Sequence, residues 1–170
     1  MHFGDLINQR FSVRAYQNTP LTESTLQSIL EASNNAPSAG NLQAYEILVV
    51  QAPEQRQALA RAALGQTQIA EAALVLVFFQ HSARSAGKYS RRGEELYALQ
   101  DATIACTYAQ LAVEALGLGS CWVGAFYKEQ VAKVKAAGQA QGIPPFEAVK
   151  AQVAQGFKQQ RMQTISQDIQ

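Results

Sequence analysis

The sequence predicts an α/β or mixed α+β domain in which helices cover a central sheet. Two short apolar runs rich in β-branched residues, 46–50 and 73–79, are typical of buried strands. They alternate with segments whose apolar residues recur at helical spacing, the longest being residues 94–116. The 170 residues are 48% hydrophobic and 16% charged, a globular composition, and their number suits a single domain over residues 1–170.

The charge and composition argue against several classes of partner. The formal net charge is +1, which gives no electrostatic attraction to nucleic acid or to an anionic membrane. No apolar run is long enough to cross a bilayer, and the first residues lack a secretory pattern, so a cytoplasmic protein is expected. Cys106 and Cys121 lie in apolar stretches and are expected to be reduced core thiols, since no CxxC spacing supports a redox pair. His2 and His81 are isolated, so no metal site is expected.

Within residues 6–16, near the start of the chain, Arg10, Ser12 and Arg14 alternate with the apolar Phe11 and Val13. In an extended conformation, Arg10, Ser12 and Arg14 point to one face. Two guanidiniums and a hydroxyl make a donor set suited to a phosphate or to carbonyl oxygens. The alternative interpretation is a solvated arginine pair at the edge of the domain, and this segment alone leaves both open.

The stretch 36–45 joins a predicted helix, residues 25–34, to the first predicted strand. It is small, polar and uncharged, and Ser38, Asn41 and Gln43 can each donate and accept hydrogen bonds. Such a loop suits a planar, hydrogen-bonding ligand better than a metal or a free phosphate. An ordinary connection built from turn residues is the alternative.

The other elements follow from the same patterns. Thr22 is the expected cap of the first helix, and Pro37 ends the helical pattern because proline cannot continue the hydrogen-bond ladder. Residues 81–93 are polar and basic, and are predicted to form a loop or mobile lid whose charges either meet an anionic dinucleotide or are only solvated. The helix over residues 94–116 is expected to be buried nearly all round and to end at Gly117, a left-handed cap. Further helices are predicted at 53–63, 66–71 and 128–137, and further strands at 120–126 and 146–157.

Three pieces of the chain, taken together, resemble the nitroreductase family of FMN-dependent oxidoreductases. The order and spacing of the pieces match that family over residues 3–157. The pieces are Arg10-Phe11-Ser12-Val13-Arg14-Ala15-Tyr16, Ala36-Pro37-Ser38-Ala39-Gly40-Asn41-Leu42-Gln43, and a stretch from Asp101 that ends Gly119-Ser120-Cys121-Trp122-Val123-Gly124-Ala125-Phe126.

The resemblance implies a three-layer α+β sandwich, with a central mixed, mainly antiparallel sheet flanked by helices and a long buried central helix. It also implies a homodimer with FMN bound in two sites at the subunit interface. The residues expected to bind the cofactor fall in four groups. They are Arg10, Phe11, Ser12 and Arg14 at the phosphate, ribityl chain and pyrimidine edge; Pro37, Ser38, Ala39, Asn41 and Gln43 from the other subunit; Trp122, Val123 and Gly124 beside the isoalloxazine; and Arg161, or else Lys158, at the phosphate.

The resemblance further implies a ping-pong reaction. Hydride passes from NADH or NADPH to FMN, and a nitroaromatic, quinone or similar small-molecule acceptor then takes the electrons. The sequence shows no catalytic triad or carboxylate pair, which agrees with chemistry that the flavin itself supplies. The brief segment 81–93 predicts an open pocket, and Thr107-Tyr108 stands where the family often has Gln-Asn.

Other functions on the same fold stay open at this stage. A non-catalytic FMN-binding or flavin-storage protein would use the same motifs. A dehalogenase or a flavin-cleaving oxygenase usually needs an added lid, and the chain has no long insertion. A structural domain without a cofactor would leave the three polar motifs unexplained. The sequence indicates neither the acceptor nor a preference between NADH and NADPH.

Overall fold

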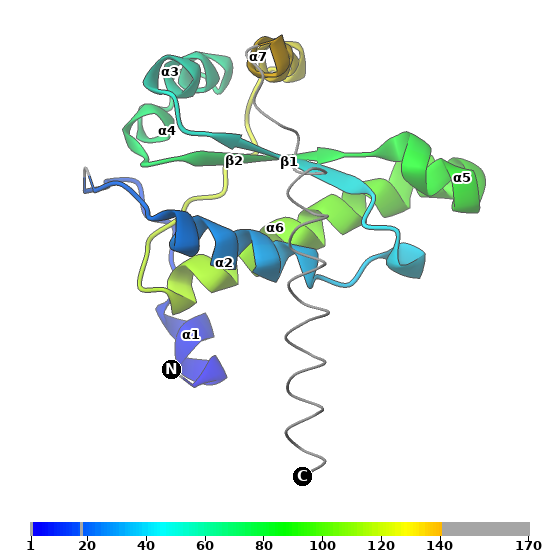
Figure 1. Cartoon of the computed structure of the whole chain (residues 1–170), viewed down its shortest axis with the longest axis horizontal. Helices are drawn as coiled ribbons and strands as arrows, with labels where there is room; N and C mark the ends of the chain where they lie inside the picture. The colour runs from blue at the N-terminus through cyan, green and yellow to red at the C-terminus, as the bar shows by residue number, and fades with distance from the viewer. Residues whose placement is uncertain (1, 18, 141–170) are drawn as a thin grey trace.

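Two antiparallel strands form the middle layer of the computed structural model, which describes residues 2–17 and 19–140. β1 (Tyr45–Val50) pairs with β2 (Val75–Gln80), so that Tyr45 lies opposite Gln80 and Val50 opposite Val75. Helices cover both faces of the pair (Figure 1), which confirms the predicted α+β sandwich. One face carries α3 (Pro53–Ala62), α4 (Gln68–Glu71) and α7 (Lys128–Ala140), and the other carries α2 (Glu23–Asn34) and α6 (Ala98–Ala115).

Each face of the strand pair has its own hydrophobic core. Successive side chains of a strand point to opposite faces, so β1 contributes Val50 to one core and Ile47 to the other. The first core joins the sheet to α3, α4 and α7, and the second joins it to α2 and α6. Buried members of the first core include Val50, Leu59, Ala62, Ile69 and Val131, and those of the second include Leu26, Leu30, Ile47, Ala102 and Ala105.

The predicted helix ends depend on local chemistry, and the structure confirms two of them. Thr22 caps α2, because its hydroxyl oxygen accepts a hydrogen bond from the backbone N–H of Thr25 at 3.2 Å. Gly117 follows α6 with a φ of 72°, the left-handed conformation that glycine adopts without a steric penalty. The boundaries of α3, α4 and α7 differ from the predicted ones by a few residues.

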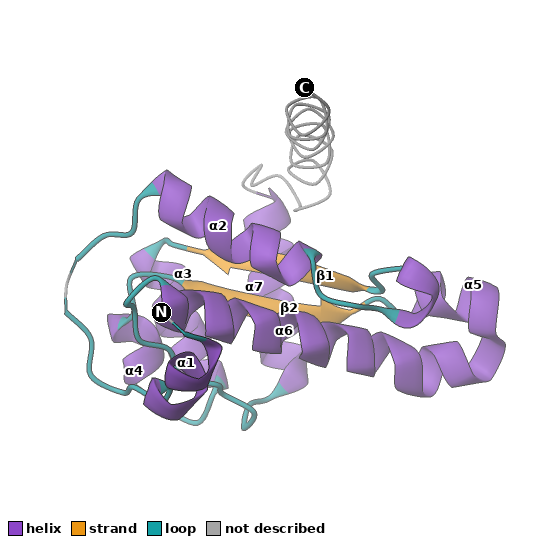
Figure 2. Cartoon of the chain, turned by 90° about the horizontal axis from the view of Figure 1, so that it is seen from below, coloured by secondary structure: helices purple, strands orange, loops and turns teal. Residues whose placement is uncertain are grey.

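The prediction of a loop or lid at residues 81–93 is wrong. This segment forms α5 (Ser82–Arg92), followed by a π-helical turn, η2 (Gly93–Tyr97), which leads into α6. The polar composition did not indicate a helix. The helix begins at a histidine cap, because His81 Nδ1 accepts a hydrogen bond from the backbone N–H of Arg84 at 3.2 Å. The helix bends at Ser90, where φ is 50°, and α5 projects beyond the end of the sheet (Figure 2).

Two other predicted elements also need correction. Residues 120–126 form no regular strand, because Ser120 makes only an isolated parallel bridge to Ser12. The extended N-terminal segment begins only at Arg10, after a short helix, α1 (Phe3–Gln9), that the alternating pattern concealed. The strand predicted at 146–157 and the phosphate contacts expected of Arg161 or Lys158 lie outside the described residues.

The long helix α6 is buried on one side rather than all round. Its small residues face the core, including Ala102 and Ala105, whereas Leu99 keeps 53% of its surface exposed and Leu116 is also exposed. The helix carries apolar residues over a wider arc than the sheet and α2 can cover. Within the described residues, the exposed side of α6 therefore carries apolar side chains such as Leu99 beside polar ones such as Thr103.

Three findings bear on the expected classes of protein. Within residues 2–17 and 19–140, no helix combines the length and apolarity needed to span a membrane. The same residues contain no cluster of three His, Cys, Asp or Glu side chains placed to hold a metal ion. Cys106 and Cys121 are free thiols, and burial raises the pKa of Cys106 to about 12.

Candidate functional site

Two of the three sequence motifs lie side by side in the structure. The arginine segment (residues 10–14) runs parallel to the start of the tryptophan segment (residues 120–124), and the backbone N–H of Val13 donates to the carbonyl of Ser120 at 2.9 Å. Gly119 permits this close approach, because a Cβ at that position would lie 2.7 Å from a methyl carbon of Val13.

The joined segments leave donors and an aromatic surface accessible. Ser12 and Arg14 are exposed, while Arg10 is partly buried. Phe11 is 65% exposed and Trp122 is 46% exposed. A Cβ on Gly124 would meet no atom nearer than the indole nitrogen of Trp122 at 3.8 Å, so the space beside the indole is open.

Tyr16 stabilises the arginine segment through a hydrogen bond to its backbone. Its hydroxyl donates to the carbonyl of Val13 at 2.8 Å. Burial, together with Cys121, raises the pKa of Tyr16 despite the opposing charge of Arg14, so the phenol remains a proton donor at neutral pH. Its hydrogen bond therefore helps to hold the extended backbone that carries the arginines.

Loop 36–45 is compact and held by its own side chains. Ser38 Oγ accepts the backbone N–H of Gln43 at 2.9 Å, and Gln43 Nε2 donates to the carbonyl of Asn34 at 2.6 Å. Two of the three neutral side chains that we expected to face a ligand therefore fix the loop itself. Asn41 remains exposed.

The backbone of this loop is in an uncommon conformation. A short 3₁₀ turn, η1 (Ala39–Asn41), contains Gly40 and Asn41, each with a φ of 57°, and Gln43 follows with a φ of 48°. Left-handed non-glycine residues cost about 1–3 kcal/mol each and persist only where the surroundings impose them. Something outside the loop must therefore stabilise it.

Asp101 of α6 supplies this stabilisation. The carboxylate is 2% exposed, and its two oxygens accept the backbone N–H groups of Ala39 at 2.9 Å and Ala44 at 3.2 Å. One buried side chain thus binds both ends of the strained turn through charge-assisted hydrogen bonds. The sequence marked Asp101 only as the start of a motif; its one signal was an acidic residue in the first turn of an apolar helix.

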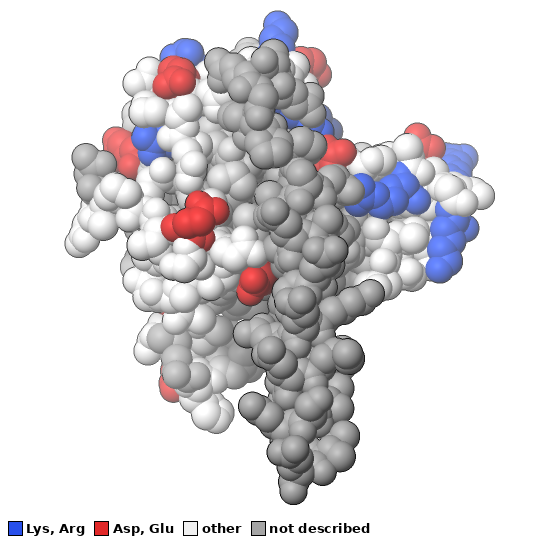
Figure 3. Space-filling model, in the orientation of Figure 1, with Lys and Arg blue, Asp and Glu red and all other residues white. Residues whose placement is uncertain are grey.

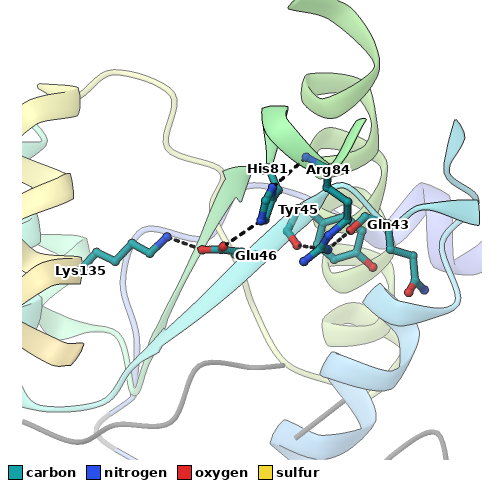
Figure 4. Close-up of polar contacts among 6 residues, drawn as sticks. All are labelled: Gln43, Tyr45, Glu46, His81, Arg84 and Lys135. Atoms are coloured by element: carbon teal, nitrogen blue, oxygen red, sulfur yellow. Dashed lines mark hydrogen bonds and ion pairs between the residues drawn. The ribbon is translucent and has the colours of Figure 1, made fainter. Parts of the chain in front are cut away.

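Arg84 of α5 holds the same loop from another side (Figure 4). Its guanidinium Nη1 donates to the carbonyl of Gln43 at 2.6 Å and approaches that of Tyr45 at 3.4 Å. The adjacent backbone N–H of His81 donates to the carbonyl of Ala44 at 2.8 Å. The segment predicted to be a lid is thus a rigid support for loop 36–45.

A family model for the nitroreductase family matches residues 7–87 and 68–157 of this chain, which together span most of its length. A curated relative, NADH dehydrogenase of Thermus thermophilus, is 34% identical over 176 residues, covering 88% of this chain and 83% of the relative. The chain belongs to the nitroreductase family. Membership places it among NAD(P)H oxidoreductases.

Solved nitroreductase structures share the fold. A nitroreductase family protein from Clostridium novyi superimposes with a TM-score of 0.70 at 21% identity, over 85% of this chain and 78% of that one. An FMN-dependent nitroreductase from Clostridium difficile superimposes with a TM-score of 0.60 at 30% identity, over 69% of this chain and 64% of that one. These likenesses agree with the three-layer arrangement around β1 and β2.

The residues of this nitroreductase fit FMN in their chemistry. Guanidinium and hydroxyl donors, as in Arg10, Arg14 and Ser12, bind phosphate well. The half-exposed indole of Trp122, with open space at Gly124, is suited to lie beside a planar ring. The donors of the arginine segment therefore suit a phosphate, and the tryptophan segment suits a planar ring.

Loop 36–45 does not join the arginine and tryptophan segments within one chain. Asp101 anchors it in the first turn of α6, whereas Ser120 anchors the arginine segment beyond the last turn, which ends at Ala115. At 1.5 Å per residue, the helix alone separates these anchors by about 20 Å. The two parts lie toward opposite ends of α6 in Figure 1.

A polar network connects the start of α5 to β1 and α7 (Figure 4). Glu46 on β1 accepts a hydrogen bond from Lys135 of α7, and its other oxygen lies 3.7 Å from His81 Nε2. Partial burial alone raises the pKa of Glu46, but Lys135 and His81 outweigh it and the net pKa is lowered.

Proposed function

We propose that this nitroreductase is an FMN-dependent enzyme that takes hydride from NADH or NADPH. It then reduces nitroaromatic, quinone or similar small-molecule acceptors in a ping-pong cycle. The observation that supports the proposal is the hydrogen bond between Val13 and Ser120, which joins the arginine segment to the start of the tryptophan segment.

The chain's own residues bind and orient in this mechanism. Arg10, Ser12 and Arg14 hold the phosphate, ribityl chain and pyrimidine edge, with Phe11 beside them. Bound FMN supplies the hydride-accepting chemistry. A fixed guanidinium at the pyrimidine edge would stabilise negative charge on the reduced cofactor. Trp122, Val123 and Gly124 shape the ring face where donor and acceptor bind in turn, and no side chain is required as acid or base.

We further propose that the active form is a homodimer in which loop 36–45 lines the partner's flavin. The separation of the loop from the arginine segment along α6 supports this arrangement, because one chain cannot bring them to the same ring. The uncovered apolar side chains on α1 and α6 also support it, since burying them stabilises association. These exposed side chains are Phe3, Ile7, Leu99 and Leu116.

Replacing Leu99 by glutamate is expected to convert the dimer to a monomer with loss of most bound FMN. A charge at this 53% exposed position would have to be desolvated in an α6 interface. Size-exclusion chromatography with light scattering measures the mass, and absorbance measures the flavin per chain.

Leu64→Glu is the matched control, because Leu64 is 59% exposed and follows α3 on the other face of the sheet. We expect it to remain dimeric and to retain FMN. A Leu99→Glu protein with unchanged mass and flavin content would contradict an interface at this part of α6.

The flavin itself is the direct test of the proposed function. Purified protein is expected to be yellow and to release FMN on denaturation, and NADH or NADPH should bleach it anaerobically. Adding a nitroaromatic should then restore the yellow colour. Protein that cannot be loaded with FMN would refute the proposal, and loaded protein that neither nucleotide bleaches would indicate flavin storage instead.

A further inference from the structure

The surface of α5 carries a group of cations that the proposed FMN site does not use. The helix contains Lys88, Arg91 and Arg92 on its exposed side and has no acidic residue. Figure 3 shows Lys and Arg side chains gathered over the projecting end of the molecule where α5 lies. Arg91 is paired, since its Nε lies 2.7 Å from a carboxylate oxygen of Glu95.

Lys88 and Arg92 are held by aromatic rings rather than by carboxylates. Tyr89 and Tyr97 pack edge to face with their ring centroids 5.1 Å apart. The Lys88 ammonium lies 5.5 Å from the Tyr89 centroid, and the Arg92 guanidinium 5.5 Å from that of Tyr97. Arg92 Nε also donates to the Tyr97 hydroxyl at 2.8 Å. Within residues 2–17 and 19–140, no carboxylate forms an ion pair with either cation.

This cation–tyrosine cluster (Lys88, Tyr89, Arg92 and Tyr97) touches the loop proposed to line the flavin. A Cβ at Gly40 would lie 2.6 Å from Lys88 Nζ and would also collide with the Tyr89 hydroxyl. The cluster can contact the loop because Gly40 has no side chain. The cluster thus adds uncompensated positive charge at the edge of an otherwise neutral loop.

We propose that Lys88 and Arg92 form a phosphate-binding subsite for the nicotinamide dinucleotide donor. The inference rests on the proposed function, which brings the nicotinamide ring to the flavin beside this loop. Ammonium and guanidinium groups are the preferred protein partners of phosphate. The pyrophosphate of either donor and the 2′-phosphate of NADPH are both anionic groups of this kind. A bound phosphate would neutralise the positive charge that the cluster leaves unpaired.

Calorimetric titration of the holoprotein with NADP⁺ and with NAD⁺, at low salt, tests the subsite without turnover. Lys88→Gln/Arg92→Gln is expected to weaken NADP⁺ binding about tenfold, as loss of two charge-assisted phosphate contacts would. Weakening confined to NADP⁺ identifies the 2′-phosphate as the group bound, and equal weakening of NAD⁺ identifies the pyrophosphate. An affinity unchanged for both nucleotides overturns the proposal.

Lys133→Gln/Arg61→Gln removes the same charges from exposed positions on α7 and α3, across the sheet from α6. It should bind both nucleotides as the wild type does, and equal weakening in this control would overturn a specific subsite. Thermal melting of both variants confirms that they fold. Protein without FMN would refute the proposed function, whereas unchanged affinities in a flavin-loaded variant would refute the subsite alone.

Discussion

A mixed dimer of two differently disabled chains is expected to recover about half of the wild-type activity, because one of its two symmetric sites is intact. The first chain carries Arg14→Ala, which removes a cation from the arginine segment. The second carries Gly40→Val in loop 36–45, where a β-branched residue at a φ of 57° is strained and its side chain would meet Lys88. Each homodimer is expected to have at most a tenth of wild-type activity, because both of its sites are defective.

The recovery distinguishes a shared site from one built within a chain. If the loop serves the partner's flavin, the mixed dimer pairs a normal arginine segment with a normal loop at one site and combines both defects at the other. If each chain built its own site, both sites of the mixed dimer would be defective and nothing would be recovered. Coexpressed chains with two affinity tags allow the mixed dimer to be purified and its nitroaromatic reduction measured.

Gly65→Val is the matched control for the loop variant. Gly65 has a φ of 76°, and no atom lies within 4 Å of a Cβ placed there, so valine brings similar backbone strain away from the site. This variant is expected to be less stable but active as a homodimer. A mixed dimer no more active than its parent homodimers would rule out a site shared between subunits.

Asp101→Asn is expected to lower the melting temperature by about 10 °C and to reduce FMN retention, because a charged acceptor of two backbone N–H groups is lost. Asparagine presents one oxygen and one NH₂ group to Ala39 and Ala44, so one buried donor faces another donor. The cost is about 2–4 kcal/mol of folding free energy. The loop would then relax from its left-handed conformation and no longer present Asn41 as it does now.

Glu94→Gln provides the comparison, since Glu94 is exposed and the change in charge is the same. Its melting temperature and flavin content should match the wild type. Differential scanning calorimetry measures the melting temperature, and flavin absorbance on the same preparations measures FMN retention. An Asp101→Asn protein with wild-type melting and full flavin content would show that the loop does not depend on this carboxylate.

The structure also shows where sequence patterns misled. Residues 81–93 looked like a polar lid because they lack an apolar stripe, but α5 begins at a histidine cap and is fixed by the contacts of Arg84 with Gln43. Residues 120–126 looked like a strand because they are apolar and β-rich, yet only Ser120 pairs. For α5, the contact of Arg84 with Gln43, 41 residues earlier, could not be predicted from local propensity.

Sequence patterns were enough to predict the family resemblance, the alternation of strands and helices, the Thr22 cap and the left-handed Gly117. Each of these depends on residue types close together in the chain. Three further features became visible in the folded chain. Asp101 binds a turn 62 residues earlier, Gly119 brings the arginine and tryptophan segments together, and α6 separates loop 36–45 from them. The physical reason is that a buried carboxylate, a missing Cβ and the length of a helix act through space, and spacing along the chain does not encode their partners.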